Sequence, residues 1–232
     1  MSAASDEQTH RSGLEGEGRL ESEAAPPVPH MSAWQTAVKR LADFLFSLTA
    51  VIVLAPLGLI VAAAVKLDSK GPVFFKQLRV GRNGGLFTIY KFRSMHENAD
   101  QMKQQLEELN EAEGPVFKIK RDPRITRVGA FIRRTSLDEL PQFLNVLKGD
   151  MSLVGPRPAL PKEVDKYTDY QRGRLAVVPG LTCLWQIQGR SSLSFERWVE
   201  LDLEYISRQS LWLDLVIILK TIPAVLKGTG AY

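Results

Sequence analysis

An uncharged apolar segment near the start of the chain limits what this protein can fold into. Residues 44–65 read FLFSLTAVIVLAPLGLIVAAAV and include no charged side chain. A helix over this segment would be about 33 Å long, which matches the hydrocarbon core of a bilayer. Runs of this length are rare in soluble domains, where a buried core helix is the alternative. We therefore expect a membrane helix here.

Two features of this segment favour a helix that enters the membrane and returns to the same face. Lys39 and Arg40 precede the apolar run, and Lys66 and Lys70 follow it. Because positive charge marks the cytoplasmic side, both ends are expected there. Pro56 lies just past the middle, where it removes a helical hydrogen bond and bends the axis. A single spanning helix is the alternative that the sequence leaves open.

The charge distribution and the scarcity of histidine and cysteine limit which partners and which kinds of catalysis are possible. Residues 1–30 hold six acidic and two basic side chains, so the net charge of +4 for the whole chain leaves +8 on residues 31–232. A basic body favours an anionic partner, such as lipid head groups, phosphorylated small molecules or nucleic acid. Cys183 is the only cysteine, and His96 is the only histidine beyond residue 30. Zinc sites and Ser–His or Cys–His catalysis are therefore disfavoured, and the chemistry should fall to carboxylates.

Beyond the membrane segment, the pattern predicts an α+β fold that is mostly helical. Short strands are expected at 72–77 and 86–92, with the turn VGRNGG between them. Periodic polar and apolar positions predict the helices. Their expected ranges are 96–113, 124–134, 136–147, 193–206 and 211–227. Ser194 is expected as the N-cap of the helix at 193–206.

The last of these helices is strongly apolar but poorly suited to spanning a membrane. Asp214, Lys220 and Pro223 interrupt residues 211–227. Trp212 suits the level of the lipid head groups. We expect an amphipathic interfacial helix here.

Two adjacent carboxylates, Asp138 and Glu139, stand out in RRTSLDELPQFLN. Ser136 and Glu139 have the S-x-x-E spacing of a capping box. With Ser136 as the N-cap, Pro141 would lose a helical hydrogen bond, whereas with Asp138 as the N-cap it falls in the first turn at little cost. Either way, Asp138 is expected at a helix N-terminus, which favours a carboxylate and attracts phosphate. Helix capping and catalysis are both compatible with this pattern.

Five cations are candidates for binding phosphate. Arg157 lies between two prolines in GPRP, and a guanidinium on a constrained backbone suits bidentate phosphate contact. Lys91 and Arg93 come from KFRSM, and Arg133 and Arg134 precede the acid pair. Ordinary surface ion pairing is the alternative for each arginine.

Asp202 and Asp214 lie in strongly apolar surroundings. Mg²⁺ takes one or two carboxylates plus substrate phosphates, so both are candidate sites for a metal-bound substrate. Alternatively, Asp202 pairs with a nearby arginine and Asp214 begins a helix. The chain contains no G-x-G-x-x-G and no P-loop, so the familiar nucleotide-binding folds are disfavoured.

Four motifs taken together resemble the bacterial sugar transferases, the monotopic phosphoglycosyl transferases. The resemblance runs from about residue 38 to the C-terminus, and its long middle motif is very specific. The closing KGTGAY and GRSSLSFERWVELD look like the branch that transfers galactose or glucose phosphate. A four-helix membrane region found in longer members does not precede it, so the small form is expected. The motifs are KFRSM, SLDELPQFLNVLKGDMSLVGPRP, PGLTCLWQIQGRSSLSF and WVELDLEYISRQSLWLDL.

The resemblance implies a reaction and its residues. Sugar-1-phosphate would pass from a UDP-sugar to undecaprenyl phosphate with release of UMP, through a covalent phosphosugar–aspartate intermediate and with Mg²⁺. Asp138 would be the nucleophile, and Glu139 its partner as Mg²⁺ ligand or proton handler. The expected substrate- and phosphate-binding residues are Lys91, Arg93, Arg133, Arg134, Arg157, Asp202 and Asp214.

The resemblance also implies a location. Residues 33–67 would be a re-entrant helix broken at Pro56, and residues 68–232 a cytosol-facing catalytic domain. The resemblance does not cover the start of the chain, where composition rather than resemblance predicts that residues 1–32 are a disordered acidic tail. The protein would lie on the anionic bilayer of the bacterial inner membrane, with no nucleic-acid partner. Members usually have Ser before the proline, whereas Ala55 stands here.

Two other functions and several details are left open by the sequence. The first alternative is a membrane-bound glycosyltransferase that releases UDP. The second is a non-enzymatic basic protein that docks on the membrane. The identity of the sugar and the oligomeric state are not specified.

Overall fold

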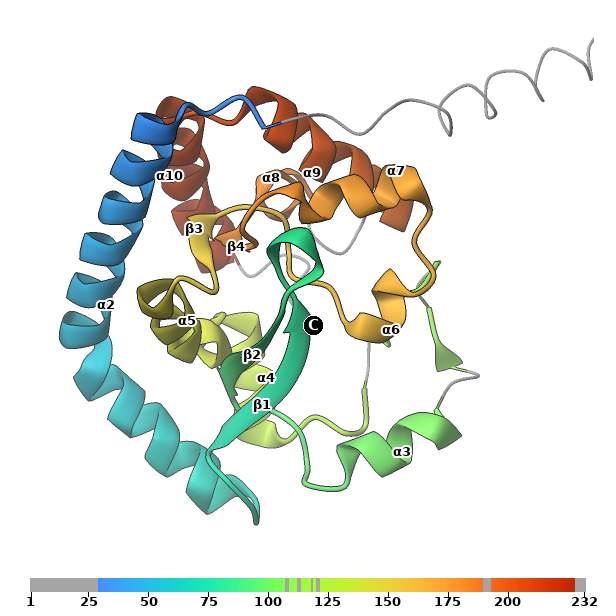
Figure 1. The fold of residues 1–232 in the computed structure, drawn as a ribbon. Helices are drawn as coiled ribbons and strands as arrows, with labels where there is room; N and C mark the ends of the chain where they lie inside the picture. The colour runs from blue at the N-terminus through green and yellow to red at the C-terminus, as the bar shows by residue number, and fades with distance from the viewer. Residues whose placement is uncertain are drawn as a thin grey trace, which may run out of the picture.

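The structure is a computed structural model that describes residues 29–106, 109–111, 114–117, 119, 122–189 and 193–227. Most of the predicted acidic tail and most of KGTGAY lie outside these residues. A long helix, α2 (Ala33–Asp68), curves along one side of a domain built from short helices and two small sheets (Figure 1). The predicted α+β class with mostly helical content is confirmed.

Helix α2 begins at a capping box. The Ser32 side chain accepts a hydrogen bond from the Gln35 backbone N–H, and Gln35 Oε1 accepts from the Ser32 N–H at 2.9 Å. The helix then runs for 36 residues with Pro56 inside it. The predicted break at Pro56 is therefore not a gap between two helices. A proline removes only its own N–H···O bond, so the neighbouring bonds continue the helix around it.

A β-hairpin follows α2. Strands β1 (Phe74–Val80) and β2 (Leu86–Phe92) pair antiparallel, with Phe75 opposite Lys91. A 3-10 turn, η1 (Arg82–Gly84), joins them, and Asn83 adopts φ 55° there. Asparagine tolerates the left-handed region better than most residues, which suits this tight connection. Both strands and the turn were predicted.

The rest of the domain is a succession of short elements. The predicted helix at 96–113 is much shorter as α3 (Ala99–Gln105), although residues 107–108 and 112–113 lie outside the described residues. Ser194 caps α9 as predicted, since its side chain accepts from the Arg197 N–H. The remaining elements are α4 (Arg127–Arg134), η3 (Leu137–Gln142), α5 (Phe143–Lys148), β3 (Ser152–Val154), α6 (Pro161–Val164), α7 (Asp169–Arg172), η4 (Gly173–Ala176), β4 (Gly180–Thr182), α8 (Leu184–Gln188), α9 (Phe195–Arg208) and α10 (Leu211–Lys227).

Strands β3 and β4 form a parallel pair that holds the GPRP loop in place. A Cβ on Gly180 would lie 2.0 Å from the Gly155 nitrogen, so only glycine fits at this approach. The Gly155 N–H donates to the Thr182 carbonyl, and the Gly180 N–H donates to the Pro156 carbonyl. The backbone leading to Arg157 is therefore fixed by hydrogen bonds as well as by its flanking prolines.

Two apolar cores organise the domain. The larger core joins the C-terminal helices to β3 and includes the fully buried Val154, Leu201, Tyr205 and Ile217. The smaller core joins the C-terminal half of α2 to the hairpin and α4. It is formed by Val61, Val65, Phe92 and Ile132.

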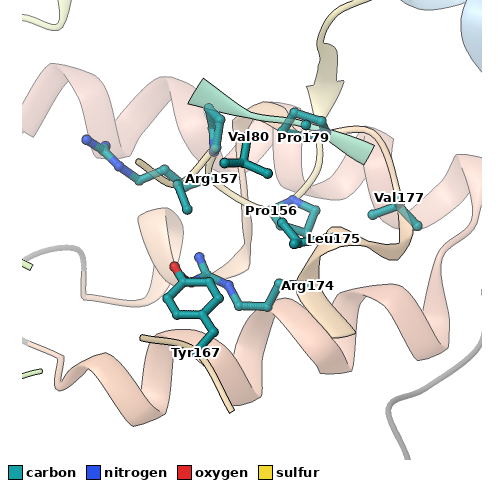
Figure 2. A pocket seen from close by; sticks show the side chains of 11 residues that line it. Val80, Pro156, Arg157, Tyr167, Arg174, Leu175, Val177 and Pro179 are labelled. Atoms are coloured by element: carbon teal, nitrogen blue, oxygen red, sulfur yellow. The ribbon is translucent and has the colours of Figure 1, made fainter. Parts of the chain in front are cut away.

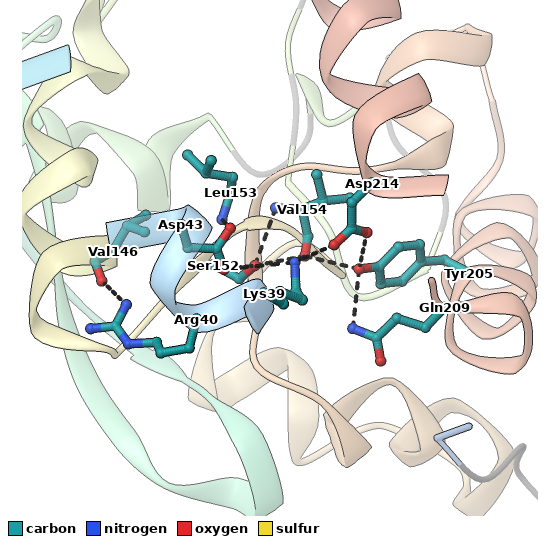
Figure 3. Close-up of polar contacts among 10 residues, drawn as sticks. All are labelled: Lys39, Arg40, Asp43, Val146, Ser152, Leu153, Val154, Tyr205, Gln209 and Asp214. Atoms are coloured by element: carbon teal, nitrogen blue, oxygen red, sulfur yellow. Dashed lines mark hydrogen bonds and ion pairs between the residues drawn. The ribbon is translucent and has the colours of Figure 1, made fainter. Parts of the chain in front are cut away.

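The N-terminal half of α2 is fastened to the domain by charged side chains. Lys39 and Asp43 are buried, and they contact β3 and α10 (Figure 3). Asp43 accepts from the Ser152 hydroxyl at 2.7 Å. Arg40 donates to the carbonyls of Val146 and Leu147 at the end of α5. Both ends of α2 therefore contact the same domain.

Apolar side chains remain exposed on two helices. Within the described residues, α2 is the one helix long and apolar enough to cross a membrane, and only 11% of its most apolar window is buried. Such exposure distinguishes it from a core helix of a soluble protein. Helix α10 also turns apolar side chains outward at a spacing of three or four, which places them on one face. They are Trp212, Leu215, Leu219 and Ile222.

Candidate active site

The hairpin and η3 bring Lys91 to the acid pair. Strand β2 packs against η3. The Lys91 Nζ lies 2.6 Å from Glu139 Oε1 and 4.0 Å from Asp138 Oδ2. Lys91, Asp138 and Glu139, three of the predicted site residues, are therefore neighbours in space.

The predicted helix cap is wrong in detail. Ser136 adopts φ 57° and ψ 16°, and its side chain makes no capping hydrogen bond. The acids lie in the 3-10 helix η3, and the α-helix α5 begins only at Phe143. Pro141 explains this arrangement, because it lacks the N–H that an α-helix starting at Ser136 would need. Asp138 is thus presented from a tight turn rather than from the first turn of an α-helix.

Asp138 is a buried carboxyl group whose oxygens are not occupied by the protein. Its exposure is 7%, and it accepts no hydrogen bond from the described residues. Burial raises the pKa of Asp138 to about 6, against the opposing effect of Lys91 and with a further increase from Glu139. A desolvated carboxylate with free lone pairs is well suited to act as a nucleophile.

Glu139 differs from its neighbour in environment. Burial would raise its pKa, but the charges of Lys91 and Arg157 and the hydrogen bond from Lys91 bring the pKa below its usual range. Glu139 is therefore the acid that stays ionised, whereas Asp138 carries the proton as the pH falls. Environments that push the pKa values of two neighbouring acids apart are typical of catalytic pairs.

The acid pair fits Mg²⁺ in its donor chemistry. Carboxylate oxygens are hard ligands, and Mg²⁺ is usually held by one or two of them together with substrate phosphates. The described residues contain no cluster of three or more His, Cys, Asp and Glu side chains that would hold a metal alone. Asp138 and Glu139 could thus hold the ion only together with a phosphorylated substrate, which is the usual arrangement for Mg²⁺.

A small pocket lies beside Glu139. Arg157 from the GPRP loop lines it together with residues of β1 and β2. Three cations line it against one carboxylate, which gives a formal charge of +2. The lining residues are Arg79, Ile89, Lys91, Glu139, Gln142, Arg157, Pro158, Gly180, Leu181 and Gln186.

Arg157 also borders a second hollow on the other side of its loop. Figure 2 shows its side chain pointing away from Tyr167 and Arg174, which lie together in that hollow. The Arg174 guanidinium donates to the Tyr167 hydroxyl at 2.9 Å. The guanidinium of Arg157 is instead available to the pocket beside Glu139.

The other predicted arginines differ in their position. The charge of Arg133 acts on the pKa of Asp138, so it lies near the acid pair. Arg134 is exposed at the end of α4. Arg93 donates from its two terminal nitrogens to the carbonyls of Lys70 and Ser69 beyond the end of α2, and only its Nε has no partner among the described residues. Arg93 is therefore a helix-end contact in this structure, and its phosphate-binding role stays a prediction without a structural argument.

Asp202 and Asp214 are held in ion pairs outside the pocket. Asp202 is completely buried and accepts from Arg174 Nε and Nη2 at 2.8 and 2.6 Å. Asp214 accepts from Lys39 at 2.5 Å and from the Tyr205 hydroxyl at 2.7 Å. These contacts match the simpler alternative for Asp202, pairing with an arginine. Neither acid lines the pocket beside Glu139.

Two pocket residues were missed by reasoning from the sequence. Arg79 lies in the strand motif QLRVG, and Gln142 lies within DELPQ. Both side chains are buried and line the pocket with Glu139. Nothing in the local pattern marks them, because their role depends on the packing of β2 against η3 and on the contact between β1 and the GPRP loop.

Comparison with known proteins agrees with this arrangement. Residues 34–228 match the bacterial sugar transferase family. The chain is 48% identical over 194 residues to the galactosyl transferase CpsE of Streptococcus agalactiae, covering 83% of this chain and 43% of that protein. It is 43% identical over 198 residues to the exopolysaccharide production protein ExoY of Sinorhizobium fredii, covering 84% and 88%.

A third relative is the undecaprenyl-phosphate galactose phosphotransferase of Salmonella typhimurium. It is 45% identical over 199 residues, with 84% of this chain and 42% of that protein covered. This chain thus spans less than half the length of CpsE and of the Salmonella protein. The family match extends from the start of α2 to the end of α10, through both the long apolar helix and the acid pair. The chain therefore belongs to the bacterial sugar transferase family.

Proposed function

We propose that this protein transfers sugar-1-phosphate from a UDP-sugar to undecaprenyl phosphate and releases UMP. The observation that carries the proposal is the free, buried carboxylate of Asp138 beside Lys91 and a cationic pocket. The Salmonella relative is named for transfer to undecaprenyl phosphate, and ExoY for exopolysaccharide production. We infer the same class of acceptor and pathway here.

In the first half-reaction, Asp138 attacks the phosphorus atom that carries the sugar. A bond forms between a carboxylate oxygen of Asp138 and this phosphorus. The bond between phosphorus and the bridging oxygen breaks, and its electron pair leaves on UMP. Lys91 and Arg157 reduce the repulsion between the carboxylate and the diphosphate, which is the main electrostatic barrier to such an attack.

In the second half-reaction, an oxygen of undecaprenyl phosphate attacks the same phosphorus. The bond to Asp138 breaks, and its electron pair restores the carboxylate. The products are a sugar diphosphate lipid and the unmodified enzyme. Glu139, which Lys91 keeps ionised, holds the position of Lys91 throughout.

Mg²⁺ is part of this proposal. Asp138 and Glu139 would hold the ion with the donor diphosphate, where it would supply positive charge. Lys91 would still offset the negative charge of the diphosphate while Asp138 and Glu139 hold the ion.

The contacts of α2 support a location on one face of the membrane. Lys39 and Asp43 near its start and Val61 and Val65 near its end are buried against one domain. The middle of the helix is largely exposed and apolar. A helix that spanned the bilayer would separate its ends by the thickness of the membrane, and one domain could not readily contact both. The outward apolar face of α10 supports contact with the same surface.

Product analysis tests this reaction. Purified protein with Mg²⁺, undecaprenyl phosphate and a panel of UDP-sugars should release UMP with one sugar. Incubation with that UDP-sugar alone should add the mass of a phosphosugar to the protein. UDP as the only nucleotide product would support the glycosyltransferase alternative instead.

The Asp138→Asn variant tests the nucleophile. Both UMP release and the covalent adduct should be lost, because an amide is a very weak nucleophile. The fold should persist, since replacement of a buried charge by an amide removes a desolvation cost. Asp165→Asn, at an exposed position, is the matched control and should behave like the wild type. Unchanged UMP release in Asp138→Asn would rule out Asp138 as the nucleophile.

A further inference from the structure

Two buried nitrogen donors in the pocket beside Glu139 have no acceptor among the described residues. They are Nε of Arg79 and Nε2 of Gln142, and their residues are 8% and 3% exposed. An unpaired buried donor carries a desolvation cost that native structures usually avoid. Both residues line the same pocket, which indicates that a ligand from outside the chain accepts hydrogen bonds from both nitrogens.

The remaining contacts of Arg79 hold it in position for such an acceptor. Its Nη1 donates to the Pro158 carbonyl at 2.9 Å, and its Nη2 donates to Gln77 Oε1 at 2.6 Å. The two terminal nitrogens are therefore fastened, one of them to the loop that carries Arg157. The Nε–H is left as the free donor on a side chain that cannot easily turn away.

Gln142 is placed next to the acid pair. Its amide contributes to the low pKa of Glu139, so it lies close to that carboxylate, although Nε2 has no acceptor in hydrogen-bond geometry. An amide nitrogen carries two hydrogens, and at least one of them is available to a ligand. Gln142 thus lies close to Glu139, and both line the same pocket.

The charge of the pocket identifies the ligand as an anion. Lys91 is neutralised by Glu139 at 2.6 Å, whereas Arg79 and Arg157 have no carboxylate at ion-pair distance within the described residues. The charge of Arg157 adds to burial in lowering the pKa of Arg79, so the two guanidinium groups are close enough to repel each other. An anion between them would remove this repulsion.

We propose that Arg79 and Gln142 are substrate-binding residues that donate hydrogen bonds to the diphosphate of the nucleoside diphosphate sugar. This inference rests on the proposed function, which identifies the ligand as a nucleoside diphosphate sugar. A diphosphate carries about two negative charges, which match the formal charge of the pocket lining. With Arg157, the two residues hold the diphosphate beside Glu139, one residue along the chain from the nucleophile.

Binding of simple ligands tests this role without catalysis. The full chain in detergent with Mg²⁺ is titrated calorimetrically with pyrophosphate and with UDP. Gln142→Met keeps the length of the side chain but removes the donor, and Arg79→Lys keeps the charge but removes Nε–H. Each should raise the Kd of both ligands by about tenfold to a hundredfold, as expected for the loss of one hydrogen bond to a charged group.

Controls separate binding from folding. Gln188→Met, at an exposed position on α8 outside the pocket, should leave both Kd values unchanged. Arg79→Lys also loses its contacts to Pro158 and Gln77, so Gln142→Met decides the outcome if Arg79→Lys lowers the melting temperature.

Three results would overturn the inference. They are no binding of either ligand to the wild type, Kd values for Gln142→Met within threefold of the wild type, or an equal change in Gln188→Met. Failure of the proposed function is visible elsewhere, because UDP release in the product assay would leave these binding results intact. Conversely, UMP release with unchanged Kd values would overturn only the roles of Arg79 and Gln142.

Discussion

Lys39 and Asp214 form a buried ion pair between the start of the long apolar helix α2 and the C-terminal helix α10. The Lys39 Nζ lies 2.5 Å from Asp214 Oδ2, although the residues are separated by 175 positions in sequence. Tyr205 donates to the other carboxylate oxygen, and Lys39 also lies 3.6 Å from Asp43 (Figure 3). This pair joins α2 to the domain that carries the acid pair.

Loss of Lys39 alone should destabilise the protein. Lys39→Met leaves Asp214 buried without its cation, and removal of one partner of a buried pair costs about 3–5 kcal/mol. Thermal unfolding in detergent should show a lower melting temperature. Lys70→Met, at an exposed position, is the matched control and should have little effect.

The double variant and the pH dependence test the cause. Lys39→Met with Asp214→Asn should regain part of the loss, because the unpaired charge at Asp214 is gone and only Asp43 still lacks Lys39. Burial already raises the pKa of Asp214, which Lys39 opposes, so loss of Lys39 raises it further. The folded state then takes up a proton more readily than the unfolded state, and the deficit should shrink as the pH falls. Strictly additive losses and a deficit independent of pH would contradict this account.

The acid limb of the pH–rate profile, where the rate falls at low pH, should report the protonation of Asp138. Its pKa of about 6 means that the carboxylate becomes protonated below this pH. Single-turnover UMP release from the donor alone should therefore fall about tenfold per pH unit on the acid side. The lipid phosphate is omitted so that its own titration does not contribute.

Lys91 sets the position of this limb. Its charge lowers the pKa of Asp138, so Lys91→Met should move the limb to higher pH as well as slow the reaction. Lys162→Met, exposed and outside the pocket, should leave the profile in place. An unmoved limb in Lys91→Met would assign the titration to another group.

Asp202 should behave as a structural residue. Asp202→Asn leaves the buried Arg174 without its carboxylate, and we expect a loss of several kcal/mol in the free energy of unfolding. The Mg²⁺ concentration for half-maximal rate should stay unchanged in the protein that folds. A large shift in this concentration, with an unchanged melting temperature, would instead make Asp202 a metal ligand.

Cysteine labelling tests the topology of α2. His30 and Asp100 are exposed before and after the helix, whereas Cys183 is buried. A membrane-impermeant maleimide should react with His30→Cys and Asp100→Cys from the same side of sealed vesicles. The protein without a new cysteine controls for Cys183. Labelling from opposite sides would establish a spanning helix.

Elements with strong local signals were predictable from the sequence. The apolar run of α2, the hairpin around Asn83 and the cap at Ser194 follow from hydrophobic pattern, turn residues and capping chemistry. These signals act over a few neighbouring residues, so they survive without knowledge of the fold. The family resemblance then singled out Asp138 and Glu139 as catalytic residues, whereas the local pattern alone favoured a helix cap.

Only the tertiary structure decided how these parts work together. The 3-10 turn at Asp138, the meeting of Lys91 with Glu139 and the free donors of Arg79 and Gln142 depend on contacts between distant segments. Likewise, Arg93 and Asp214 looked like site residues in the sequence, whereas packing gives them backbone carbonyls and Lys39 as partners. A charged side chain pairs with whichever group the fold brings near it, and the residues next to it in the sequence do not determine that partner.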